Sequence, residues 1–301
     1  MPAKIKLTFL GTSDAVPSSR RNHTSILVSD GAENILIDCG EGTQRQFKKA
    51  RLSPMKITKL LITHWHGDHV LGIPGLIQTL AFENYKKTLF IYGPKGTKKF
   101  VDSVLKAFTF YGHVNLKVEE VEDEKFFENE DFFLESKSMT HGIPCNAYVF
   151  VKKEKIKIDK KKLKKSGLPQ DFLLRNLKEG KDVLYNGKKY LAKNLTYREG
   201  NKKISFVLDT SFNEKILPFV KDSDLIVCES NYGEDMNELA KERKHMTARN
   251  CGEIAKKSNS KRLVLTHISR RYDKNPGKIL DEAKKIFKKV SIAEDLEKIE
   301  V

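Results

Sequence analysis

The sequence predicts a mixed α/β fold made of two β/α halves, with a basic segment inserted between them. Short β-rich runs bounded by turn residues alternate with helical patterns in the first part of the chain, and this alternation resumes at residue 202. The stretch between the two parts lacks the alternation and is rich in lysine. Because a sheet and its covering helices share one core, the two regular parts are expected to be halves of a single domain.

In the first half, β-rich runs between turn signals identify the strands. Apolar residues at three- and four-residue spacing identify the helices, as in Val101, Val104, Leu105 and Phe108. Strands are expected at residues 5–10, 25–29, 34–38, 59–63, 89–92, 115–121, 132–138 and 146–151, and helices at 74–84 and 96–110. The strand at 59–63 leads directly into a histidine-rich loop.

In the second half, strands are expected at residues 204–208, 224–228 and 263–266, and helices at 213–220, 247–257 and 276–287. Pro276 suits the first turn of the last helix, where a missing N–H costs nothing. The predicted organisation is therefore one domain over residues 1–301, with about 152–200 as an inserted arm.

The composition is that of a globular protein, with 39% hydrophobic and 32% charged residues. The sequence has no apolar run of the ~20 residues that a membrane span needs, and its start lacks a signal-peptide pattern. A cytoplasmic protein without a membrane partner is therefore expected. The four cysteines form no Cys-x-x-Cys pair, so they are expected to be reduced, mostly buried thiols.

Positive charge is concentrated in the inserted segment. The chain has 56 Lys and Arg against 40 Asp and Glu, a net charge of +16 that suggests a polyanionic partner. Residues 151–203 contain 18 basic and 6 acidic residues, so +12 lies in this segment and only +4 in the rest. Such charge runs are usually solvated loops, but this excess is confined to one insertion.

The strongest chemical signal is the loop His64-Trp65-His66-Gly67-Asp68-His69. His64 and His66 are two residues apart at the end of a predicted strand, so both side chains point to one side and can reach one ion. Asp68 and His69 cannot easily join them, but a turn at Gly67 can direct both toward a second ion. Three histidines and one aspartate within six residues predict a metal site, and their spacing predicts two metals.

A site for two metals needs further ligands, and the candidates are His141, Asp209 and His267. Each of them follows a predicted strand. Asp209 suits a position shared by the two ions because a carboxylate has two oxygens, whereas imidazoles suit terminal positions. This donor set favours zinc, with manganese or iron as alternatives. His23 and His113 are isolated and are interpreted as core or surface histidines.

The complete pattern resembles the metallo-β-lactamase superfamily over almost the whole chain. Its elements are His-x-His-x-Asp-His, followed by a distant His, Asp and His at strand ends. The resemblance implies a four-layer αββα sandwich of the metallo-β-lactamase type, with the metal site at one edge. Because that superfamily hosts many chemistries, the function has to be inferred from other motifs.

Further motifs resemble ribonuclease Z, a family of endonucleases that remove the 3′ trailer from precursor tRNA. Residues 9–13 and 17–22 resemble its N-terminal loop, with Ser19 where the family usually has lysine. Residues 71–76 extend the metal loop as in that family. Glu229 and the later run His-Met-Thr at 245–247 resemble its Glu loop and His-Ser-Thr motif. Residues 167–169 and 177–183 resemble its flexible tRNA-binding arm, with an altered Gly-Pro order.

The resemblance implies a role for each candidate residue. Two zinc ions per subunit, or manganese in their place, would be held by His64, His66, Asp68, His69, His141, Asp209 and His267. His245 would be the general acid, Glu229 would orient its ring and raise its pKa, and Asp68 would accept a proton or orient the nucleophile. Precursor tRNA would contact Arg21, Asn22, Lys160, Lys161, Lys162, Lys164, Lys165 and Lys178.

The implied activity is zinc-dependent endonucleolytic cleavage that leaves a 3′-hydroxyl on the tRNA. The resemblance also implies a homodimer in which the arm of one subunit holds tRNA for the site of the other. Three alternatives stay open at this point. The protein could be a general phosphodiesterase on small or cyclic diesters, a lactamase or thioesterase, or a non-catalytic RNA-binding subunit. A phosphodiesterase on small diesters would gain little from a basic arm, and a lactamase or thioesterase would need neither this arm nor the motif at 245–247.

Overall fold

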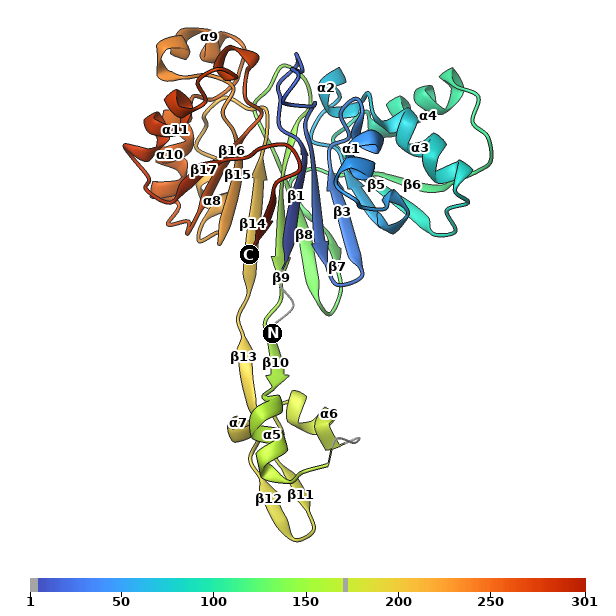
Figure 1. Ribbon diagram of the computed structural model, residues 1–301, viewed down its shortest axis with the longest axis vertical. Coiled ribbons are helices and arrows are strands. Elements are labelled where there is room, and N and C mark those ends of the chain that lie inside the picture. Colours follow the sequence, from blue (N-terminus) through green and yellow to red (C-terminus); the bar gives the residue numbers. More distant parts are fainter. Residues whose placement is uncertain (1–4, 170–172) are drawn as a thin grey trace.

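The computed structural model describes residues 5–169 and 173–301. Two seven-stranded mixed sheets pack face to face, and helices cover the outer face of each sheet (Figure 1). The four-layer αββα sandwich implied by the sequence resemblance is therefore confirmed. Within the described residues, no helix has both the length and the apolar character needed to cross a membrane.

The first sheet has the strand order β18-β1-β2-β3-β4-β5-β6. Its strands are β1 (Lys6–Gly11), β2 (Ser25–Asp30), β3 (Glu33–Ile37), β4 (Lys59–Leu61), β5 (Thr88–Gly93), β6 (Asn115–Glu120) and β18 (Lys298–Glu300). Strands β3 to β6 are parallel neighbours. Helices α1 (Thr43–Lys49), α3 (Ile73–Phe82) and α4 (Thr97–Ala107) connect them, as parallel strands require crossover connections.

The second sheet has the order β17-β16-β15-β14-β9-β8-β7. Its strands are β7 (Lys125–Glu128), β8 (Phe132–Ser138), β9 (Asn146–Lys152), β14 (Lys202–Val207), β15 (Leu225–Glu229), β16 (Leu263–Thr266) and β17 (Val290–Ile292). Its covering helices are α8 (Ile216–Val220), α10 (Ala248–Lys257) and α11 (Gly277–Lys284). Helix α10 begins at a capping box in which Thr247 and Asn250 satisfy each other's backbone N–H groups.

The hydrophobic core has three layers, which hold the sheets and helices in fixed positions. Phe9, Tyr148 and Phe206 belong to the layer between the two sheets, and they are fully buried. Separate apolar clusters fill the space under the helices of each half. Because packing at this density tolerates little movement, the strand ends are rigid supports for the loops that follow them.

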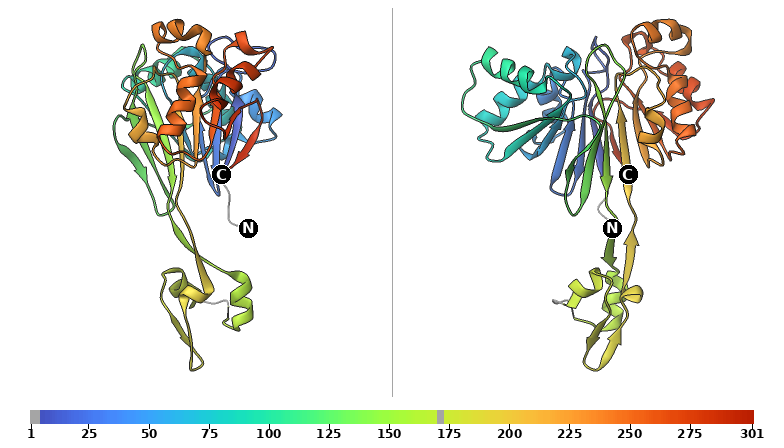
Figure 2. Two further views of the ribbon diagram at one scale, coloured as in Figure 1. Left: turned by 90° about the vertical axis from the view of Figure 1, so that its left-hand side faces the viewer. Right: turned by 180° about the vertical axis from the view of Figure 1, so that it is seen from behind.

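The inserted segment folds into a small arm that projects from one end of the sandwich (Figures 1 and 2). Its stem is the antiparallel pair β10 (Lys155–Ile158) and β13 (Thr196–Glu199). Its head contains α5 (Lys160–Ser166), α6 (Leu173–Lys178), β11 (Val183–Tyr185), β12 (Lys188–Tyr190) and α7 (Ala192–Leu195). Residues 170–172 of the predicted insertion lie outside the described residues.

Most predicted elements agree with the structure to within a few residues, but some were missed or too long. The helix predicted at 96–110 ends at Ala107, because Phe108 has an extended backbone. The sequence patterns did not identify α1, β7, β17 or β18, nor the short helices α2 (Gly67–Val70) and α9 (Asn237–Glu242). These elements are seven residues or shorter, so they contain too few periodic positions to be recognised. All four cysteines are free and buried, as expected.

Candidate active site

The predicted metal ligands meet at the end of the sandwich opposite the arm, near α2 (Figure 1). His64 and His66 follow β4, and the helical turn α2 begins at Gly67 and carries Asp68 and His69. His141, Asp209 and His267 lie in the loops after β8, β14 and β16. Their ligand atoms fall into two groups, each with its members within 4.8 Å of one another.

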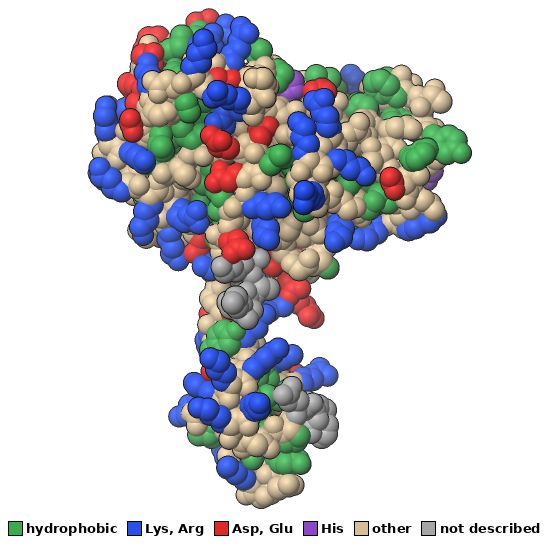
Figure 3. Space-filling view, in the orientation of Figure 1, with side chains coloured by type: hydrophobic (Ala, Val, Ile, Leu, Met, Phe, Trp, Pro, Cys, Tyr) green, Lys and Arg blue, Asp and Glu red, His purple; other side chains and the backbone are tan. Residues whose placement is uncertain are grey.

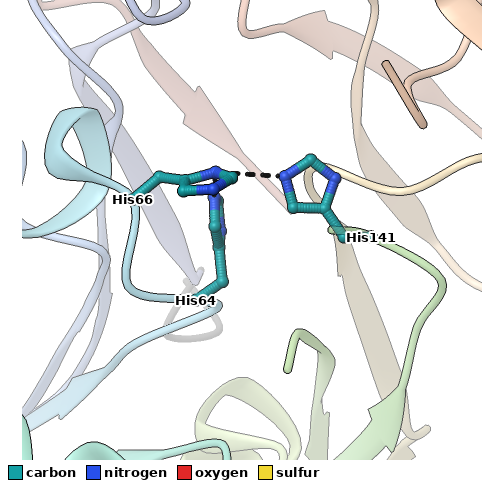
Figure 4. Close-up of side chains that lie close together, drawn as sticks. All are labelled: His64, His66 and His141. Atoms are coloured by element: carbon teal, nitrogen blue, oxygen red, sulfur yellow. Dashed lines mark hydrogen bonds between the residues drawn. The ribbon is translucent and has the colours of Figure 1, made fainter. Parts of the chain in front are cut away.

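The first group consists of three histidines whose ring nitrogens converge (Figure 4). His64 Nε2 lies 3.0 Å from His66 Nδ1, and His141 Nε2 lies 3.1 Å from the same atom. The His141 ring is oriented by its Nδ1–H, which donates to the backbone oxygen of Lys244 at 3.2 Å. This arrangement leaves three nitrogen lone pairs directed at one point, as a divalent ion requires.

The second group consists of two histidines and two aspartates. His69 Nε2 and His267 Nε2 are 3.2 Å apart, and both lie 3.3 Å from Asp68 Oδ2. Asp209 Oδ1 is 3.4 Å from His69 Nε2 and 3.3 Å from His267 Nε2. The other oxygen, Asp209 Oδ2, lies 3.7 Å from His64 Nε2 in the first group. Asp209 therefore stands between the two groups.

The donor atoms fit divalent metal ions. Asp209 Oδ1 is buried and has no hydrogen-bond partner among the described residues. A buried carboxylate oxygen without a partner is costly, and a cation at this point would satisfy it. Imidazole nitrogens together with carboxylate oxygens are the ligands that zinc commonly takes in catalytic sites. Both groups therefore have the chemistry of metal sites.

Asp38, which the sequence patterns did not identify, connects the two groups. Its Oδ2 accepts a hydrogen bond from His69 Nδ1 at 2.7 Å and another from Thr63 Oγ1 at 2.7 Å. Its Oδ1 accepts from the backbone N–H of Thr63 at 2.7 Å. Thr63 Oγ1 lies 3.1 Å from His64 Nδ1 and can accept a hydrogen bond from its N–H group. Asp38 therefore directs Nε2 of one histidine in each group toward the metal position.

Three site residues have a left-handed backbone, which is unusual for residues other than glycine. Asp38, Asp209 and His267 have φ angles of 56°, 44° and 56°, and each follows a buried strand. Such conformations cost on the order of 1–3 kcal/mol each and persist only where the surrounding structure enforces them. The left-handed backbone at these three residues thus lowers the stability of the fold and turns their side chains toward the site.

The electrostatics differ between the two groups. Burial lowers the pKa of His64, His66 and His141 below the usual range, so these rings are neutral and can act as ligands. In the second group, burial disfavours the protonated form of His69, yet the charges of Asp209 and Asp38 raise its pKa well above the usual range. The second group therefore attracts positive charge, which a divalent ion would supply.

His245 and Glu229 form a hydrogen-bonded pair beside the second group. His245 Nδ1 lies 3.1 and 3.0 Å from the two carboxylate oxygens of Glu229. Glu229 is fully buried, and its Oε1 also accepts from the backbone N–H of Thr210 at 2.8 Å. Although burial lowers the pKa of His245, the charge and hydrogen bond of Glu229 raise it to about 9. The ring therefore holds a proton at neutral pH, and its Nε2 is the nitrogen that Glu229 does not engage.

The structure does not support the predicted contact between Arg21 and a substrate. The Arg21 side chain is buried, with the residue only 5% exposed, and Nη1 donates to Thr12 Oγ1 at 2.7 Å and to the Ala293 oxygen at 2.6 Å. Its guanidinium also lies 3.6 Å from the carboxylate of Asp273. Arg21 thus fixes the N-terminal loop against the C-terminal segment. Asn22 is partly exposed, and its Nδ2 donates to the Glu41 oxygen at 2.7 Å.

The predicted arm lysines are exposed and lie away from the metal groups. Lys160, Lys161, Lys162, Lys164 and Lys165 belong to α5, and Lys178 ends α6. Asp159 caps α5 by accepting from the N–H groups of Lys161 and Lys162. Basic side chains cover much of the arm on the face seen in Figure 3. The arm is thus a positively charged surface at the far end of the molecule.

The fold and this site define a class of protein, the metal-dependent hydrolases with the metallo-β-lactamase fold. A solved metallo-β-lactamase fold protein, YhfI from Bacillus subtilis, has a TM-score of 0.72 to the structure, with 19% identity and coverage of 99% of this chain and 100% of that chain. At this identity the likeness shows the fold alone, and the ligand groups add the hydrolase chemistry.

Closer relatives identify the family. The ribonuclease Z of Nanoarchaeum equitans (strain Kin4-M) is 37% identical over 293 residues, which are 97% of this chain and 92% of the relative. The solved human tRNase Z, short form, has a TM-score of 0.70 and 26% identity, with 98% of each chain covered. The chain therefore belongs to the ribonuclease Z family over nearly its whole length. Its residues 5–155 also match the family model described as "Anti-Pycsar protein Apyc1". It is accordingly a metal-dependent endoribonuclease that hydrolyses phosphodiester bonds.

Proposed function

We propose that the protein is a zinc-dependent endoribonuclease that removes the 3′ trailer from precursor tRNA and leaves a 3′-hydroxyl on the tRNA. The observation that carries the proposal is the Glu229–His245 pair, 3.0 Å apart, beside two convergent ligand groups. A hydrolase that cuts a phosphodiester needs an acid for the leaving oxygen, and this pair supplies one. The names of the ribonuclease Z relative and the human tRNase Z support tRNA as the substrate.

Two zinc ions per subunit are proposed, with manganese as an alternative. One would be held by His64 Nε2, His66 Nδ1 and His141 Nε2, and the other by His69, His267 and Asp68, with Asp209 between the two. Ions in such a pair, when bound, activate water at neutral pH and neutralise the charge on the phosphate. The negative character of the second group supports this assignment.

The side chains of the chain handle the protons of the reaction. Asp68 Oδ2 faces both histidines of the second group at 3.3 Å and can accept a proton from the attacking water. As the new P–O bond forms and the bond to the leaving 3′ oxygen breaks, His245 Nε2 donates its proton to that oxygen. Glu229 holds the ring and stabilises its charged form before the transfer. The products are a tRNA with a 3′-hydroxyl and a trailer with a 5′-phosphate.

The arm is proposed to bind the phosphates of tRNA through Lys160, Lys161, Lys162, Lys164, Lys165 and Lys178. Cationic side chains gain affinity for nucleic acid by releasing counterions. Because the arm leaves the sandwich at the end opposite α2 (Figure 1), it points away from the metal groups of its own chain. This direction supports a homodimer in which the arm of one subunit holds tRNA for the site of its partner.

The test compares two substrates of the zinc-loaded protein, a trailer-bearing precursor tRNA and a cyclic mononucleotide. The proposal expects cleavage of the precursor at one position, with a much higher kcat/KM than for the cyclic diester. Preference for the cyclic diester would instead indicate a small-molecule phosphodiesterase. Binding of tRNA without turnover, at full metal content, would indicate a non-catalytic RNA-binding subunit.

A further inference from the structure

We propose that a surface beside the first ligand group binds single-stranded RNA and holds the 3′ trailer of the substrate. This trailer surface consists of Trp65, Phe100, Lys95, Lys98 and Lys99. The inference rests on the proposed function and deepens it, since it assigns a path to the strand that is cut off. The trailer surface includes none of the residues that were assigned above to the metal groups or to the arm.

The aromatic part of the trailer surface is built into the metal loop. Trp65 stands between His64 and His66, and its ring stacks on that of Phe100, with 5.0 Å between centroids and 27° between planes. The indole Nε1–H donates to Thr97 Oγ1 at 2.9 Å, and Thr97 Oγ1 donates to the Pro94 oxygen at 2.7 Å. The indole is therefore fixed from two sides. Phe100 remains 44% exposed, although it belongs to an ordered helix.

The same surface is positively charged. Lys98 and Lys99 are exposed in the first turn of α4, and Lys95 is exposed just before this helix. No carboxylate forms an ion pair with these three lysines in the part of the chain that the structure describes. The nearby Glu120 is already engaged, because its Oε1 accepts from the backbone N–H groups of Gly96 and Lys98 at 3.1 and 3.0 Å. The lysine ammonium groups are thus available to an anionic strand.

An exposed aromatic ring among lysines matches single-stranded nucleic acid better than it matches a duplex or a protein. Unpaired bases stack on aromatic side chains whatever their sequence, while lysines follow the phosphates. A duplex keeps its base faces stacked inside, and the cores of protein interfaces are depleted of lysine. Because Trp65 stands between His64 and His66 in the sequence, a strand stacked on this surface would run beside the metal loop.

The trailer is the part of the substrate that this surface suits. Stacking makes no hydrogen bonds to the edges of the bases, so it does not distinguish one base from another. It therefore tolerates the varied sequences that a discarded strand can have. The basic arm lies at the other end of the molecule, where it is proposed to hold the tRNA body (Figure 1). In the proposed homodimer, the trailer surface of one subunit and the arm of its partner would bind opposite sides of the cleavage point.

Trp65 provides a direct binding assay, because it is the only tryptophan in the sequence. The zinc-loaded protein is titrated with a 2′-O-methyl RNA strand of about eight nucleotides, which resists cleavage. We expect saturable quenching of Trp65 fluorescence, about tenfold weaker binding for Phe100→Ala, and retained binding for Phe100→Tyr. Absence of quenching, or equal quenching by a duplex of the same length, overturns the proposal.

The lysines are tested by the salt dependence of the same titration. The double variant Lys98→Ser with Lys99→Ser should reduce the slope of log K against log salt by about 1.4, since each phosphate contact with a single strand contributes about 0.7. The matched control is Lys288→Ser with Lys289→Ser, an exposed lysine pair in the second half of the chain. A slope that changes equally in both double variants overturns the phosphate contacts.

Cleavage kinetics separate this inference from the proposed function. Two precursors are compared, one with a long trailer and one with a trailer of one nucleotide. Phe100→Ala should raise the ratio of the long-trailer KM to the short-trailer KM about tenfold. An unchanged ratio overturns the trailer surface while the wild-type cleavage still supports the proposed function. If the wild type cuts neither precursor, the proposed function fails, and the fluorescence titration still decides whether the surface binds single-stranded RNA.

A measurement of molar mass by light scattering completes the test. The proposal expects Phe100→Ala to have the same mass in solution as the wild type. A lower mass for the variant would show that Phe100 lies in a contact between copies of the chain, and it would overturn the assignment to RNA.

Discussion

Replacing Asp38 with Asn tests whether one buried carboxylate sets the metal affinity of both ligand groups. Asp38 accepts three hydrogen bonds, two at Oδ2 from His69 Nδ1 and Thr63 Oγ1 and one at Oδ1 from Thr63 N. An asparagine has one oxygen and one NH₂ group, so its NH₂ must face at least one of these donors in either orientation. The substitution preserves the shape of the side chain, replaces one acceptor oxygen with a donor NH₂ group and removes the negative charge.

The hydrogen bonds that Asp38 accepts determine the expected size of the effect. One mismatched buried donor costs about 1–3 kcal/mol. Loss of the carboxylate behind a metal-binding histidine lowers metal affinity or activity about 10–100-fold, or about 1.4–2.7 kcal/mol. We expect Asp38→Asn to lower zinc affinity in this range and kcat with it, because the tautomers of His64 and His69 are no longer fixed.

The assay measures zinc affinity by competition with a chelator, and kcat on precursor tRNA at saturating zinc. Asp30→Asn is the matched control, since Asp30 pairs with Lys152 at 2.6 Å and is not part of the ligand groups. Wild-type zinc affinity and kcat in Asp38→Asn would refute the argument. So would an equal loss in Asp30→Asn, which would point to general destabilisation.

The other predictions concern the acid, the arm and the buried arginine. His245→Ala should keep its zinc and lose about 10²–10⁴-fold in turnover; loss of zinc would reassign His245 as a ligand. A general acid works only while it is protonated, so kcat of the wild type should fall as the pH rises through about 9. Glu229→Gln should move this fall to lower pH, because it removes the negative charge that keeps His245 protonated. An unchanged pH profile in Glu229→Gln would contradict the pairing of Glu229 with His245. Replacing residues 155–199 with a short glycine linker should weaken precursor cleavage but spare bis(p-nitrophenyl) phosphate, and equal losses on both substrates would refute the arm assignment. Arg21→Ala should lower the free energy of unfolding in urea by about 1–3 kcal/mol, whereas unchanged stability with a raised KM would restore Arg21 as a substrate contact.

The site residues that could be predicted from the sequence are those that lie close together or follow clear strands. The loop at 64–69 holds four of the proposed ligands in six residues, so local geometry suffices. His141, Asp209 and His267 were placed at strand ends because an apolar run precedes each of them. Asp38 also follows such a run, and it was missed because the predicted strand at 34–38 included it. A polar residue at the end of a buried strand is the signal that would have identified it.

Other features depend on contacts that no local pattern contains. Arg21 has the same chemistry whether it binds phosphate or is buried, and its partner Ala293 is 272 positions away in the sequence. In the sequence, the arm is recognisable only by its excess of positive charge. In the structure, it also has an apolar cluster that includes Leu163, Leu177 and Leu195. Apolar residues spread so thinly among lysines give no periodic signal, so only the structure shows that the arm is a folded unit.

The chemistry of the product ends tests the central claim most directly. A trailer-bearing precursor tRNA is cleaved by the zinc-loaded protein, and both new ends are identified by mass spectrometry. Attack by water on the phosphorus, with His245 protonating the leaving oxygen, predicts a 3′-hydroxyl on the tRNA and a 5′-phosphate on the trailer. A 2′,3′-cyclic phosphate on the tRNA would show attack by the neighbouring 2′-hydroxyl, and it would contradict the roles assigned to both ligand groups.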